Sequence, residues 1–119
     1  MTSLPIQYIQ TACLTYVQGT YPDLTPKILS LDTYTYKESY LYTSNYPYTV
    51  YIRGTNFSAN GITSVTLGPY KNIPITFFSS NSISFIIPLN AKPGEYNLQV
   101  VNTNIYGSLF SNTIVFVIE

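Results

Sequence analysis

Histidine and tryptophan are absent from this sequence of 119 residues, and cysteine occurs once, at Cys13. Without histidine the chain has no Ser-His-Asp triad, no Cys-His pair and no imidazole metal ligand. A single cysteine excludes an intramolecular disulfide and a cysteine-based zinc site. We interpret Cys13 as a small apolar side chain. The sequence therefore predicts a protein that is not an enzyme and that needs no cofactor or metal.

Charge is scarce as well. Lys and Arg number 5, Asp and Glu number 5, and charged residues make up 8% of the chain, against about 25% in a typical soluble protein. The acids are dispersed, so the sequence predicts neither a carboxylate pair for glycoside hydrolysis nor a converging set of calcium ligands. The zero net charge leaves no basic field for nucleic acid.

No part of the sequence is expected to enter a membrane or to direct export. No window approaches 18 consecutive apolar residues. The N-terminus lacks the basic and apolar regions of a signal peptide. These features favour a virion or another intracellularly assembled particle over secretion.

Short alternating runs fill the chain from Lys27 to the C-terminus, separated by turn pairs such as Asn60-Gly61 and Pro93-Gly94. A period of two is typical of strands with one buried face. Pro74 interrupts one run and marks an edge strand or a bulge. About seven short strands predict an all-β, immunoglobulin-like β-sandwich over residues 27–119. The runs are Ile28–Leu31, Tyr48–Arg53, Ser64–Leu67, Ile73–Phe78, Ser82–Ile87, Tyr96–Val101 and Thr113–Ile118.

Residues 1–26 have no sustained period and are interrupted by prolines, which predicts an extended N-terminal arm. Two short stretches of the arm alternate enough to add a strand to a neighbour's open sheet edge. A disordered or self-docked tail is the alternative that stays open. The candidate docking residues are Ile6, Tyr8, Tyr16 and Val17.

Two stretches carry a family resemblance. Residues 48–58 form an alternating strand that ends in Gly54-x-Asn56-Phe57, and residues 94–102 begin with Gly94-x-Tyr96 and end at an asparagine. With the opening run at 26–31 and the run at 82–88, this order resembles the IPT/TIG domain. That immunoglobulin-like fold occurs in plexins, in Rel-type transcription factors and in many extracellular and microbial proteins. Rel-type DNA contacts need basic loops, and this chain has one Arg and four dispersed Lys, so no nucleic-acid partner is expected.

The motif residues also have a physical interpretation as fold-forming positions. Gly54 is expected to end a strand in a conformation with positive φ, and Phe57 to fold back under the sandwich. The Gly94-x-Tyr96 pair fits a tyrosine corner, in which the hydroxyl binds a nearby backbone group. We interpret Asn56-Phe57-Ser58, which matches the N-glycosylation pattern, as part of the fold.

Tyrosine is the most unusual component, with 13 copies and seven of them between positions 34 and 51. Pairs two residues apart place their rings on one side of an extended segment, and tyrosine is enriched at protein interfaces. Ordinary half-buried strand aromatics are the alternative, and a glycan platform is possible but not favoured because tryptophan is absent. The candidate interaction surface is Tyr34, Tyr36, Tyr40, Tyr42, Tyr46, Tyr48 and Tyr51.

These features predict a non-catalytic structural protein that packs with other protein subunits into a larger assembly. An uncharged polar surface with few charged residues favours association. The Ile-, Asn- and Tyr-rich composition is typical of an AT-rich genome, so a minor capsid or coat component of a large DNA virus is one expected role. The alternative is an extracellular adhesion or glycan- or protein-binding module.

Overall fold

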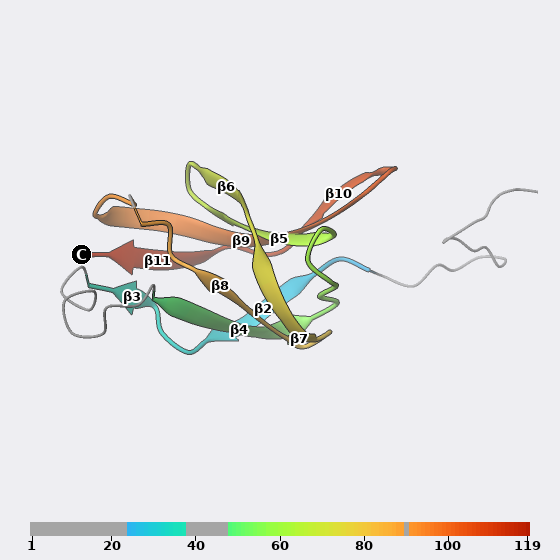
Figure 1. Ribbon diagram of the computed structural model, residues 1–119, viewed down its shortest axis with the longest axis horizontal. Coiled ribbons are helices and arrows are strands. Elements are labelled where there is room, and N and C mark those ends of the chain that lie inside the picture. Colours follow the sequence, from blue (N-terminus) through green and yellow to red (C-terminus); the bar gives the residue numbers. More distant parts are fainter. Residues whose placement is uncertain (1–23, 38–47, 90) are drawn as a thin grey trace, which may run out of the picture.

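The computed structural model describes residues 24–37, 48–89 and 91–119, and these form two β-sheets packed face to face without a helix (Figure 1). The four-stranded sheet has the order β2 (Lys27–Leu31), β4 (Thr49–Thr55), β8 (Ser82–Ile86), β7 (Ile75–Ser79). The second sheet has the order β3 (Thr35–Tyr36), β11 (Ile114–Ile118), β9 (Gly94–Asn104), β5 (Thr63–Leu67), β6 (Tyr70–Ile73), and β10 (Gly107–Phe110) also pairs with β9. This is the A-B-E-D and G-F-C arrangement of immunoglobulin domains. The predicted all-β sandwich is confirmed.

Alternation along the strands builds the core. The inward residues of β4 and β8, among them Val50, Ile52 and Phe85, are at most 1% exposed. They face Leu98 and Phe116 of the other sheet, both fully buried. Period two in the sequence therefore corresponds to the buried face of each sheet.

The run predicted at residues 73–78 is two strands. Pro74 lies between β6 and β7, where the chain passes from one sheet to the other, and each of these strands is the edge of its sheet. Proline has no N–H to give to a ladder, so it fits this corner. β3 and β10 were not predicted, because neither shows an alternating pattern. β3 has only two residues, and the four residues of β10 are all exposed.

A pair of tyrosines fixes the loop before β9. The Tyr96 hydroxyl donates to the carbonyl oxygen of Lys92 at 2.6 Å, which is the tyrosine corner predicted for this residue. The Lys92 N–H donates to the hydroxyl oxygen of Tyr70 at 3.0 Å, and the two rings meet edge to face with centroids 5.8 Å apart. Gly68, at φ +56°, leaves room for this packing, since a Cβ there would lie 2.5 Å from Cδ1 of Tyr96. The side chains of Tyr96 and Tyr70 thus bind the carbonyl oxygen and the N–H of Lys92.

Alkaline titration tests this arrangement. Partial burial, and then the neighbouring Tyr70 hydroxyl, raise the pKa of Tyr96 above its ordinary value of 10.0. The folded state thus favours the neutral hydroxyl, so its contribution to stability is complete below pH 10 and is lost as the pH rises through the raised pKa. We expect Tyr96→Phe to lower the melting temperature near pH 8 and to reduce the further loss between about pH 8 and about pH 11. Tyr106→Phe, at an exposed position, is the control; identical profiles for both variants would contradict the assignment.

The positive φ predicted for Gly54 is wrong, although the position does require a glycine. Gly54 lies inside β4, paired with Ile28 of β2, and it is not among the glycines with positive φ. A Cβ at this position would lie 1.9 Å from the carbonyl oxygen of Lys27 and 2.5 Å from Cζ of Phe57. The residue is therefore required by close packing between two strands and a ring. Phe57, 4% exposed, folds back against the core as predicted.

The two motif stretches meet through their asparagines. The side-chain amide of Asn102, in β9, donates to the carbonyl oxygen of Asn56 at 2.7 Å, and its Oδ1 accepts from the hydroxyl of Thr63. The same Thr63 oxygen accepts from the Ser58 N–H at 2.7 Å. Asn56 has φ +63°, and its Nδ2 donates to the carbonyl oxygen of Thr25 at 3.0 Å. This network joins three parts of the chain and gives Asn56 the structural role predicted for it.

Candidate functional site: an uncharged interaction surface

Tyr51, Phe78 and Ile86 are three of the half-exposed apolar side chains of the four-stranded sheet. Tyr51 and Phe78 stack with ring centroids 6.1 Å apart and an interplanar angle of 29°. Ser84, paired with Tyr51 on the strand between them, is only 4% exposed. Ile86 lies two residues further along β8, on the same face. We call Tyr51, Phe78 and Ile86 the outer-sheet patch.

β-strand register and one irregularity create the patch. β4 pairs with β8 so that Tyr51 lies opposite Ser84, and β7 pairs with β8 on the other side. The register between β7 and β8 shifts between Phe77 and Ser79. Such a bulge re-aims the side chain within it, and here it accompanies the stacking of Phe78 on Tyr51.

The structure separates the predicted tyrosine surface. Tyr36 is 5% exposed and belongs to the core, and its ring centroid lies 5.1 Å from that of Tyr48 with the planes tilted by 41°. It therefore does not contribute to an exposed surface. Tyr34 is 47% exposed, but its hydroxyl accepts from the Leu31 N–H at 3.2 Å. Tyr51 is on the outer sheet face, apart from these three. Tyr40, Tyr42 and Tyr46 lie outside the described residues.

The predicted docking residues of the arm, Ile6, Tyr8, Tyr16 and Val17, also lie outside the described residues. The described chain begins at Leu24, and β2 begins at Lys27. The docking role of the arm and the boundary at residue 26 therefore stay predictions.

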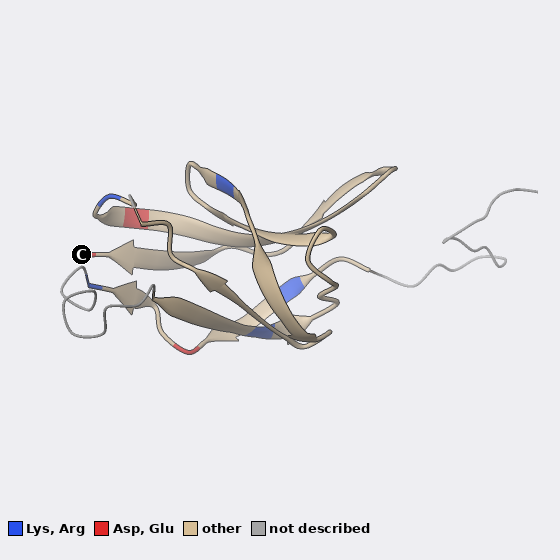
Figure 2. Cartoon of the chain, viewed as in Figure 1, with Lys and Arg blue, Asp and Glu red and all other residues tan. Residues whose placement is uncertain are grey.

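A hairpin tip adds a second apolar feature. β9 and β10 are joined by Ile105 and Tyr106, which are 90% and 81% exposed. Figure 1 shows this hairpin projecting beyond the body of the sandwich, and Figure 2 shows no charged residue on it. Phe110, at the other end of β10, is 56% exposed. The tip is therefore a protruding, uncharged and apolar element.

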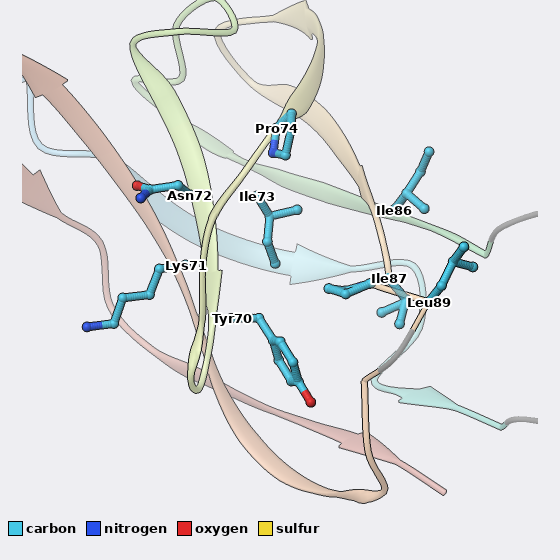
Figure 3. Close-up of a pocket in the computed structure, with 9 residues that line it drawn as sticks. Tyr70, Lys71, Asn72, Ile73, Pro74, Ile86, Ile87 and Leu89 are labelled. Atoms are coloured by element: carbon cyan, nitrogen blue, oxygen red, sulfur yellow. The ribbon is translucent and has the colours of Figure 1, made fainter.

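A groove of about 480 Å³ lies beside the corner formed by β6 and β7, next to the end of β8 (Figure 3). Tyr70, Ile73, Ile87 and Leu89 surround the space, whereas Lys71 is directed to the opposite side. Apart from Lys71, the described residues that line the groove are uncharged, so its walls offer mainly apolar contact. This groove can accept an apolar side chain of a partner.

The surfaces described above offer mainly apolar contact and hydrogen bonding. No group of three or more His, Cys, Asp or Glu that could hold a metal ion occurs in residues 24–37, 48–89 and 91–119. The same part of the chain contains no helix long and apolar enough to cross a membrane. One ion pair joins Lys37 and Glu119 at 3.8 Å across an exposed surface, where such pairs contribute little.

Sequence reasoning missed Phe78, Ile86 and the hairpin tip. A signal for the tip was present, because two large apolar residues, Ile105 and Tyr106, stand between an asparagine and a glycine, where a tight turn is expected. Phe77-Phe78 breaks strict alternation and was a signal for a bulge. The placement of Phe78 and Ile86 next to Tyr51 depends on strand register, which no local pattern in the sequence shows.

The fold and its uncharged apolar surfaces define an immunoglobulin-like interaction domain. The sequence matches the model of the IPT/TIG domain over residues 38–118, about two-thirds of the chain. The chain belongs to the IPT/TIG domain family, whose members are non-catalytic, immunoglobulin-like modules of protein–protein interaction. Comparison with curated proteins gives no match.

Proposed function

We propose that this protein is a non-catalytic structural subunit that packs against other protein subunits through its outer-sheet patch. The observation that carries the proposal is the stacked pair Tyr51–Phe78, 46% and 55% exposed, beside Ile86 at 49%. A continuous apolar surface on a rigid sheet marks an interaction site more strongly than scattered apolar residues do. Aromatic side chains contribute large contact area at low entropic cost.

The absence of charge on the patch supports a protein partner over a charged ligand. Of the outward residues next to it, Thr49 and Thr76 are uncharged, whereas Arg53 follows Tyr51 by two positions on the same face of β4. The Asp32 carboxylate accepts from the Tyr51 N–H at 2.9 Å. Burying Tyr51, Phe78 and Ile86 themselves needs no charge to be desolvated, and Arg53 and Asp32 lie at the border of the contact. The energetic core of many interfaces is a few aromatic anchors surrounded by neutral contacts.

Incorporation of charged variants into a native particle tests the proposal. We expect the wild-type protein, expressed in its native source and followed by sedimentation and mass spectrometry, to run with a particle much heavier than 13.4 kDa. Phe78→Lys and Ile86→Lys should remain at the top of the gradient while keeping the wild-type melting temperature. Val115→Lys, at a 52% exposed position on the other sheet, is the matched control and should co-sediment.

Two results would contradict the proposal. The first is a wild-type protein that sediments alone as a monomer from its native source. The second is co-sedimentation of Phe78→Lys and Ile86→Lys at the wild-type level. The first result makes the alternative function, an extracellular adhesion or glycan- or protein-binding module, the better description, and the groove beside β6 is its first candidate surface. The second result keeps the protein in the particle but excludes the outer-sheet patch as its contact.

The more specific role, a minor capsid or coat component of a large DNA virus assembled inside the cell, rests on composition. Its support is the Tyr-rich, charge-poor sequence, which suits a surface that is covered in an assembly. The particle isolated in the sedimentation experiment identifies this role directly.

A further inference from the structure

A second uncharged surface lies at the end of the sandwich where the described chain begins. A hollow of about 280 Å³ opens there, lined by Phe57 and by the partly exposed side chains of Leu24, Ile62 and Leu109. None of the described residues that line it is charged. The amide of Asn102 donates to the carbonyl oxygen of Leu24 at 3.4 Å, which holds the chain at the rim of the hollow.

β10 forms one side of this end and has a free edge. Among the described strands it pairs only with β9, with Leu109 opposite Asn102 and Gly107 opposite Asn104. Beyond the strand, the Ser111 N–H donates to the carbonyl oxygen of Val100, so the even-numbered residues of β9 direct their backbone groups toward this side. By the alternation of an antiparallel pair, the backbone N–H and C=O of Ser108 and Phe110 face away from β9.

An exposed edge of this kind is a template for strand addition. All four residues of β10 are exposed and none is charged. Natural edges are usually blocked by lysine, proline or a covering segment, and the first two are absent from β10.

We propose that the segment Thr15-Tyr16-Val17 of a second copy of this chain adds as a strand along the free edge of β10, with alternate side chains over the hollow beside Leu109. The inference extends the proposed function, because it names one subunit contact of the assembly as a contact between identical chains. It uses a different surface from the outer-sheet patch.

The occupant is indicated by the sequence that precedes Leu24. Residues 1–22 contain no Asp, Glu, Lys or Arg, so a charge-free segment meets a charge-free edge and neither side has to desolvate an ion. Six residues separate Val17 from Leu24, so the segment Thr15-Tyr16-Val17 can lie up to about 23–30 Å from Leu24 at about 3.3 Å per residue. That reach is sufficient for a second copy packed directly against this end of the sandwich.

A second copy is favoured over the chain's own edge by the prolines that flank Leu24. Pro22 and Pro26 fix their own φ and disfavour a helical conformation in the residues before them. Pro26 is among the fully buried residues, so the exit of the arm is anchored. These two restraints within five residues oppose the tight reversal that would place residues 15–17 on their own β10, so a second copy is the expected partner.

Crosslinking through the natural cysteine tests the contact. Cys13 is the only cysteine, so Ser108→Cys adds one partner on the edge of β10. Under mild oxidation we expect disulfides between Cys13 of one copy and position 108 of another, giving dimers and longer head-to-tail chains. Ser79→Cys, at an exposed position on edge strand β7, is the control and should give only links between two Cys13 residues, as the wild type does.

A mixing experiment provides the second test, using full-length chains. Tyr16→Pro removes the strand-forming capacity of the arm, and Ser108→Pro removes an outward N–H of β10 without touching its bonds to β9. We expect the wild type to show a mass that rises with concentration in sedimentation velocity, each variant alone to be monomeric, and an equimolar mixture to form a two-chain complex. In that mixture one chain supplies the arm and the other the edge.

Three outcomes would overturn the inference: a wild type that stays monomeric, a Tyr16→Pro variant that self-associates like the wild type, or a link from Cys13 to position 108 within one chain. None of these affects the proposed function, because Phe78→Lys and Ile86→Lys report on it through particle incorporation. Conversely, loss of the outer-sheet contact leaves the crosslink between copies intact. The two proposals therefore fail separately.

Discussion

Gly54→Ala is expected to lower the free energy of unfolding by about 3 kcal/mol or more, a large share of the 5–15 kcal/mol typical of a domain. The added Cβ would lie 1.9 Å from the carbonyl oxygen of Lys27 and 2.5 Å from the Phe57 ring. The first neighbour is backbone of β2, which cannot retreat without breaking its ladder with β4. The shift in the urea midpoint, followed by far-ultraviolet circular dichroism, measures the loss.

Gly61→Ala separates steric overlap from backbone conformation. Gly61 has φ +101°, but nothing lies within 4 Å of a Cβ built there. Its replacement should cost only the strain of an unfavourable φ, on the order of 1–3 kcal/mol. If Gly54→Ala were no more destabilising than Gly61→Ala, close packing would not be the reason for Gly54.

Phe57→Ala is expected to cost about 3–5 kcal/mol, the range for deleting a buried aromatic ring. The ring is 4% exposed, fills the core next to Gly54 and lines the hollow at the end of the sandwich where the described chain begins. Its removal joins the hollow to the core, so water enters and the neighbouring side chains lose packing contacts. Differential scanning calorimetry and urea unfolding measure the same loss independently.

Phe78→Ala is the matched control, because it deletes the same ring from a position that is 55% exposed. It should cost about 1 kcal/mol, from the lost stacking with Tyr51. Equal costs at positions 57 and 78 would contradict the assignment of Phe57 to the core. Combining Phe57→Ala with Gly54→Ala should be less than additive, since the ring clash at position 54 disappears while the backbone clash remains.

Strand content, core and one loop anchor were predictable from the sequence because each has a local cause. Alternation placed Val50, Ile52 and Phe85 on a buried face. Pro74 marked the position where two edge strands meet. The Gly94-x-Tyr96 spacing indicated the tyrosine corner, and the hydroxyl of Tyr96 makes that bond. In each case the determining residues are close together in the chain.

The features that were not predicted depend on residues far apart in the chain. Tyr70 completes the anchor on Lys92 from 22 positions away. Asn102 reaches the backbone of Asn56 across 46 positions, and Tyr51 meets Phe78 only through the register of three strands. Local periodicity predicts which face of the sheet a side chain lies on, whereas the residue next to it on the adjacent strand depends on the strand register. For the same reason the four tyrosines of this set that the structure describes do not form one surface: Tyr34, Tyr36, Tyr48 and Tyr51.

The pairing of the first and last strands of the second sheet gives the domain a mechanical property. β3 runs parallel to β11, and the Val117 and Glu119 N–H groups donate to the carbonyl oxygens of Tyr34 and Tyr36 at 3.0 and 2.8 Å. The described chain enters the sandwich at the end opposite its C-terminus (Figure 1). A tension applied between the two ends therefore pulls these parallel neighbours in opposite directions along their length. Both hydrogen bonds are then loaded together in shear. The sandwich therefore resists a pulling force between its two ends, because these bonds have to break together and not one at a time.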